Sequence, residues 1–166
     1  MKTSSLRLTL VAAALALLAA VPAGADHPRP ETFIAIINAP QEVPPVLDSN
    51  GQGLAFFTYD SFTRELCYSI SYDGLEESEI ASHIHGPAEP GQNAGVLFPI
   101  SPEISPLGSP KSGCVGRLTS AQGRDLRNGL LYFNVHTSSF PNGEVRGQIV
   151  GAGQNTQFVR SRVLPR

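Results

Sequence analysis

The 166-residue chain lacks most of the motifs that identify common enzymes. It contains no Walker-type phosphate loop, no Gly-x-Ser-x-Gly nucleophile elbow and no Cys-x-x-Cys pair. Beyond residue 25, no apolar run approaches the roughly 20 residues that a membrane-spanning helix needs. These absences argue against nucleotide-dependent chemistry, serine hydrolysis and a membrane span.

Residues 1–25 have the features of a secretory signal peptide. Lys2 and Arg7 precede an apolar core from Leu8 to Ala20, and Ala23-Gly-Ala25 supplies small residues for cleavage. The mature chain from Asp26 then has ten basic and fourteen acidic residues, a net charge of −4. This charge argues against nucleic acid as a partner. We therefore expect a secreted, periplasmic or extracellular protein without a membrane span.

The chain is also poor in cysteine. Cys67 and Cys114 are the only two, and in an exported protein an even count predicts a disulfide, with two free thiols as the alternative. Such a bond would act as a structural staple that closes a long loop and stabilises by about 2–4 kcal/mol.

Short strands separated by turn residues predict an all-β protein. In residues 65–72, the side chains of Leu66, Tyr68, Ile70 and Tyr72 alternate with smaller or polar ones, which is typical of a half-buried strand. Other strands are expected at 33–37, 53–59, around His83, 94–98, 113–118, 130–136 and 144–150. The pattern predicts an antiparallel Greek-key β-sandwich or barrel over residues 26–150, with a disordered tail over 151–166.

Two segments carry more specific expectations. Thr119 and Gln122 have capping-box spacing and Asn128-Gly129 is a stop signal, so residues 120–128 should form one short helix. The acidic residues 76–79 are expected to form a solvated loop.

Three of the four histidines suggest a metal site. His83 and His85 lie two residues apart, so in a strand both would project from one face. His136 lies in a second apolar strand, and three imidazoles from two strands are typical ligands of copper or zinc. The alternative is that each histidine bonds a loop carbonyl. His27 could also bind Cu(II), together with the new N-terminal amine.

Four motifs resemble those of the CHRD domain, a family named after chordin and common in bacterial secreted proteins. They are Gln41-Glu-Val-Pro-Pro45, Ser82-His-Ile-His-Gly-Pro-Ala88, Tyr132-Phe-Asn-Val-His-Thr137 and Gly143-Glu-Val-Arg-Gly-Gln-Ile149. They occur in the family's order and span almost all of the mature chain. In chordin these domains belong to an extracellular antagonist of growth factors, so the resemblance implies an extracellular module.

The family resemblance also implies kinship with Cu,Zn superoxide dismutases, which are Greek-key sandwiches. The His83-Ile-His85 segment is similar to their strand with two copper ligands, and Asn134-Val-His136 is similar to the strand that supplies another. Arg146 is similar to their arginine beside the copper, which attracts the substrate anion, although it lies closer in sequence to His136. Because no histidine lies between 85 and 136, a zinc subsite is not expected.

Two hypotheses follow from these observations. The first is a secreted copper protein, with copper preferred over zinc because the site is all imidazole in an oxidising compartment. Such a protein would either hold or deliver copper, or act on superoxide. In the second case Arg146, aided by Arg117, would steer the superoxide anion toward the copper. Whether the protein is an enzyme stays open. The second is an extracellular interaction module that binds another protein. Arg146 could instead pair with Glu144. Residues 41–45 could shape the loop next to the site or, as the simpler alternative, form a rigid turn between strands.

Overall fold

The computed structural model describes residues 28–152 and contains one eight-stranded sheet in which all neighbouring strands run antiparallel. The strand order is β5-β4-β7-β8-β1-β2-β3-β6. The strands are β1 (Glu31–Asn38), β2 (Gln52–Asp60), β3 (Glu65–Asp73), β4 (Glu79–His85), β5 (Val96–Ser101), β6 (Lys111–Arg117), β7 (Leu131–Thr137) and β8 (Val145–Gly151). The expected signal peptide and residues 153–166 lie outside the described residues.

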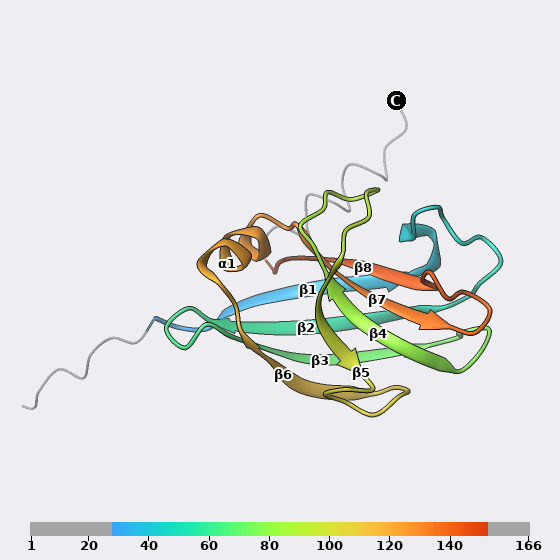
Figure 1. The fold of residues 1–166 in the computed structure, drawn as a ribbon, viewed down its shortest axis with the longest axis horizontal. Coiled ribbons are helices and arrows are strands. Elements are labelled where there is room, and N and C mark those ends of the chain that lie inside the picture. The colour runs from blue at the N-terminus through green and yellow to red at the C-terminus, as the bar shows by residue number, and fades with distance from the viewer. Residues whose placement is uncertain (1–27, 153–166) are drawn as a thin grey trace, which may run out of the picture.

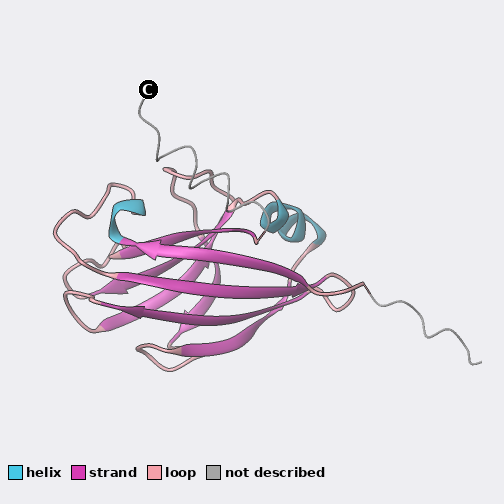
Figure 2. Ribbon diagram, turned by 180° about the vertical axis from the view of Figure 1, so that it is seen from behind, coloured by secondary structure: helices cyan, strands magenta, loops and turns pink. Residues whose placement is uncertain are grey.

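The sheet curls until it forms a nearly closed barrel. Figure 1 shows β4, β5 and β7 in front of β1, β2 and β3, and Figure 2 shows the latter three from behind. Apolar side chains from both halves fill the space between them, and six that are at most 1 % exposed are Phe57, Leu66, Ile70, Ile84, Phe133 and Ile149. The predicted all-β antiparallel fold is confirmed.

Within residues 28–152 the one α-helix is α1 (Ser120–Arg127), which begins at the predicted residue and ends one residue before the predicted Asn128. The Thr119 side chain accepts a hydrogen bond from the Gln122 backbone, and the Gln122 side chain accepts one from the Thr119 backbone. Gly129 follows with a φ of 73°, a conformation that glycine adopts without steric cost. A short 3-10 helix, η1 (Ala39–Gln41), had not been expected.

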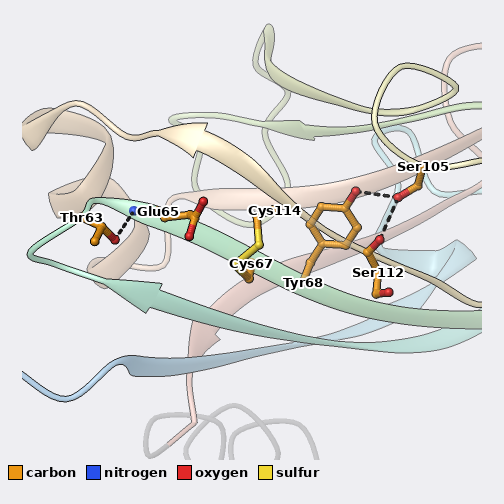
Figure 3. Close-up of a disulfide and its surroundings, with 7 residues drawn as sticks. All are labelled: Thr63, Glu65, Cys67, Tyr68, Ser105, Ser112 and Cys114. Atoms are coloured by element: carbon orange, nitrogen blue, oxygen red, sulfur yellow. Dashed lines mark hydrogen bonds between the residues drawn. A yellow bond between two sulfur atoms is a disulfide. The ribbon is translucent and has the colours of Figure 1, made fainter.

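The predicted disulfide between Cys67 and Cys114 is present (Figure 3). It joins directly paired residues of β3 and the edge strand β6, whose Cα atoms are 3.9 Å apart. Beside it, the Tyr68 hydroxyl lies 2.7 Å from Ser105 Oγ, which also donates to the Ser112 carbonyl. The disulfide therefore holds an edge strand to the sheet.

Glu79 is not in a solvated loop, so that part of the expectation for residues 76–79 was wrong. Glu79 is 5 % exposed, and its two carboxylate oxygens lie 2.5 and 2.7 Å from Lys111 Nζ. The register of β4 shifts between Glu79 and Ala81, and such a bulge changes which side chains face inward. Glu79 therefore turns into the barrel.

The Glu79–Lys111 pair connects the two ends of the sheet. Lys111 of β6 also donates to Ser101 of β5 at 2.7 Å and to Ser82 of β4 at 3.3 Å. Tyr72 donates to Glu79 at 2.6 Å. Burial raises the pKa of Glu79, but the hydrogen bonds from Lys111, Tyr72 and Ser82 outweigh it and leave this pKa below its ordinary value.

Candidate metal centre

The structure brings the three predicted histidines together on the outer face of β4 and β7. In the strand register, His83 pairs with Asn134, His85 with Tyr132, and Ala81 with His136. The ring centroids of His83 and His136 are 4.9 Å apart, and those of His83 and His85 are 5.5 Å apart. One ligand-capable nitrogen from each histidine lies within 4.8 Å of the other two.

Backbone carbonyls fix the proton positions on two of the rings. His85 Nδ1 lies 3.0 Å from the Ala94 carbonyl, and His136 Nδ1 lies 3.0 Å from the Pro141 carbonyl. Because a carbonyl only accepts, each Nδ1 donates its proton and each neutral ring keeps a bare Nε2. A carbonyl that orients an imidazole in this way is a common feature of metal sites.

One nitrogen of each ring faces the other two rings, so the three could bind a single metal ion. His85 Nε2 is buried and has no hydrogen-bond partner among the described residues. His136 Nε2 lies 3.0 Å from His83 Nδ1. With metal–nitrogen bonds of about 2.0–2.1 Å, two imidazole nitrogens on one ion lie about 3.3–3.6 Å apart. Small side-chain movements would therefore let His83 Nδ1, His85 Nε2 and His136 Nε2 share an ion.

Burial keeps the histidines neutral. It lowers the pKa of all three, and that of His85 falls to about 4 although the hydrogen bond to Ala94 acts in the opposite direction. At neutral pH the rings are therefore unprotonated at one nitrogen, which is the form that binds metals.

Arg146 lies behind the histidines rather than among them. It is 1 % exposed, and its guanidinium carbon lies 3.5 Å from the centroid of the Tyr132 ring, which stacks on His85 at 4.9 Å. Its Nη1 donates to the Gln92 carbonyl at 2.8 Å and its Nη2 to Gln148 at 3.0 Å. The guanidinium thus packs against Tyr132 and is hydrogen-bonded to the loop of residues 86–95. Its role in steering a substrate anion stays a prediction.

The alternative ion pair between Arg146 and Glu144 does not form. The buried Glu144 carboxylate instead accepts hydrogen bonds from Ser49, from the Glu76 backbone and from Thr137, at 2.6–2.7 Å. Arg117, the second expected steering residue, is exposed and pairs in the register with Glu65 of β3.

The segment of residues 41–45 contributes a buried carboxylate to the same face. Glu42 is 4 % exposed and accepts a 2.6 Å hydrogen bond from the amide nitrogen of Asn134. At Gly143, whose φ is 128°, a Cβ atom would lie 2.5–2.8 Å from both groups. Burial raises the pKa of Glu42 to about 7. Sequence reasoning quoted Glu42 within the motif of residues 41–45 but gave it no role of its own, because its partner Asn134 is distant in the sequence.

Comparisons with known proteins identify the domain. The model of the CHRD domain family matches residues 33–149, a range that contains the three histidines, Glu42 and Arg146. No curated protein and no solved structure matches the chain. Within residues 28–152, no helix is long and apolar enough to cross a membrane.

Proposed function

This chain belongs to the CHRD domain family, and we propose that it is a secreted protein that binds one copper ion through His83, His85 and His136. The observation that carries this proposal is the buried Nε2 of His85, which has no hydrogen-bond partner among residues 28–152. Leaving a buried polar atom without a partner costs about 1–3 kcal/mol, and a metal bond would remove that cost.

The donor set favours copper over zinc. All three ligands are imidazoles, and divalent copper binds nitrogen sites more tightly than the other first-row divalent ions do. A bound copper ion would supply one-electron redox chemistry. The carbonyls of Ala94 and Pro141 orient the rings of His85 and His136. His83 and His136 are partly exposed, so that a small molecule can reach them.

A superoxide dismutase-like activity is the finer form of the proposal. Its substrate is a small anion, which the charge of Arg146 attracts through space from behind Tyr132. Holding or delivering copper without turnover is the simpler form. The ionic-strength dependence of superoxide consumption, compared between the wild type and Arg146→Gln with equal copper loading, separates the two.

A different observation favours an interaction module as the second candidate. Ile36, Leu54 and Phe56 project from the outer face of β1 and β2 and are 39–50 % exposed, with Ile36 directly opposite Leu54. Adjacent exposed apolar side chains are a frequent feature of protein-binding surfaces. This function needs no metal, so a chelator would leave it intact.

The decisive experiment is a copper titration of residues 26–166 with electron paramagnetic resonance (EPR) of the Cu(II) form. We expect one tight equivalent with nitrogen hyperfine structure that is lost in His83→Ala and His85→Ala. A chain that lacks Asp26 and His27 should bind equally well, which excludes an N-terminal copper site. Absence of tight binding would overturn the proposal and leave the interaction module.

A further inference from the structure

Two buried side-chain atoms have no hydrogen-bond partner among residues 28–152, and both belong to residues on the outer face of the paired strands β4 and β7. They are His85 Nε2 and Asn134 Oδ1. Asn134 is 3 % exposed and stands directly opposite His83 in the register of β4 and β7. It also precedes His136 by two residues, so it shares the outer face with all three histidines.

The position of Asn134 puts its side chain next to two of the three histidines. Side chains directly opposite each other in an antiparallel pair have Cβ atoms about 4.5–5.5 Å apart. His83 is that cross-strand neighbour, and His136 is the next residue along the same face of β7. Asn134 is thus adjacent to two of the three ligands.

Glu42 fixes the orientation of this amide. The Glu42 carboxylate accepts a hydrogen bond from Asn134 Nδ2, and the pair occupies space that a Cβ atom at Gly143 would otherwise take. Glu42 is itself held by the turn of η1, where its backbone donates to Ala39 and Asn38 caps Gln41. Because the nitrogen is held by Glu42, the oxygen remains free for another partner.

We propose that Asn134 Oδ1 is the fourth ligand of the metal centre, held in place by Glu42. This inference rests on the proposed copper site and completes it as three nitrogens and one oxygen. It also gives the segment of residues 41–45 a positioning role. An amide oxygen is a hard donor, so it stabilises Cu(II) much more than Cu(I), for which three imidazoles suffice.

The test compares the affinities of the two oxidation states. In Asn134→Leu, the Cu(II) affinity should fall about tenfold or more while the Cu(I) affinity changes by less than about threefold, because only the hard ion loses a preferred ligand. A tenfold change in that ratio raises the one-electron reduction potential by about 59 mV. Asn134→Asp combined with Glu42→Gln keeps an oxygen ligand and a hydrogen bond between the two side chains, and it should restore Cu(II) binding.

A second variant and a control separate ligation from structure. Glu42→Leu removes the acceptor that holds Asn134 Nδ2. It should lower the Cu(II) affinity and change the Cu(I) affinity by less than about threefold, because the amide oxygen is no longer held in place. Asn50→Leu changes an exposed asparagine and should alter neither affinity. Should Asn134→Leu fail to fold, the test uses the wild type labelled with ¹³C at asparagine carboxamides. If the amide is a ligand, pulsed EPR should show a hyperfine coupling between its carbon and Cu(II).

Three outcomes overturn the inference. Equal losses of Cu(II) and Cu(I) affinity in Asn134→Leu, or no ¹³C coupling in the wild type, would remove Asn134 as a ligand but leave the three-histidine site standing. No copper binding by the wild type would overturn the proposed function and this inference together.

Discussion

The two ends of β4 carry two polar clusters that differ in whether their buried atoms have hydrogen-bond partners. At its start, Glu79 and Lys111 have side chains that are only 1 % exposed, and Tyr72, Ser82 and Ser101 complete their hydrogen bonds. At its end, the cluster of histidines and Asn134 leaves two buried atoms without a partner among the described residues. One strand thus bears a satisfied cluster and an unsatisfied one.

This difference separates a structural cluster from a binding site. A satisfied network gains nothing from a ligand, whereas unpartnered buried atoms carry a cost that a ligand removes. Lys111 beside Ser101 has the composition of a Ser–Lys nucleophile, but Ser82 and Ser101 are 0 % exposed and no substrate reaches them. The Glu79–Lys111 cluster therefore joins the ends of the sheet, and the histidine cluster is the candidate for chemistry.

The largest expected effect is on the Glu79–Lys111 cluster. Lys111→Met leaves the Glu79 carboxylate buried without its cation and should lower the free energy of unfolding by about 3–5 kcal/mol. Urea denaturation measures this change. Glu79→Leu combined with Lys111→Met removes both charges and should recover most of the loss. A loss below about 1 kcal/mol for the single variant would contradict a structural role for the pair.

Sequence reasoning succeeded where one strand or one turn determines the answer. The two-residue period of β4 places His83 beside His85, and the capping box of α1 needs only Thr119 and Gln122. It failed at Glu79 because a bulge reverses the facing of β4, which no periodic pattern contains. It also gave no role to Glu42, whose partner lies 92 residues away.

The second prediction concerns acid and the metal-free protein. Because burial lowers the pKa of His85 to about 4, its neutral ring contributes stability that is complete above about pH 6.5 and is lost as pH falls toward 4. The wild type should therefore lose up to about 3 kcal/mol more than His85→Leu between pH 7 and pH 4. Urea denaturation of both chains at each pH measures the difference, and parallel losses would contradict it.

The third prediction asks whether the histidines support the fold. His136→Ala should weaken copper binding about a hundredfold, because a ligand is lost. Its free energy of unfolding without metal should change by less than about 1 kcal/mol, because the ring is partly exposed. Copper titration and urea denaturation measure the two quantities. Equal losses of folding and of copper binding would favour the architectural interpretation of these histidines.

The smallest expected effect comes from the exposed counterpart of the buried ion pair. Arg127 and Glu31 lie 2.7 Å apart, close to the 2.5 Å of Lys111 and Glu79, but their side chains are 41 % and 36 % exposed. Arg127 lowers the pKa of Glu31, so the stability that the pair contributes is lost as pH falls through that lowered pKa.

Water around this pair screens the attraction, so Glu31→Gln should lower the free energy of unfolding at pH 7 by only about 0.2–1 kcal/mol. In 1 M salt the difference should nearly vanish, because the Debye length shrinks to about 3 Å. Glu89→Gln, an exposed carboxylate without an ion pair among the described residues, is the matched control. The two ion pairs have like charges and similar distances, so their exposure is the difference under test. If Glu31→Gln lowered the free energy of unfolding as much as Lys111→Met, exposure would not distinguish the two pairs.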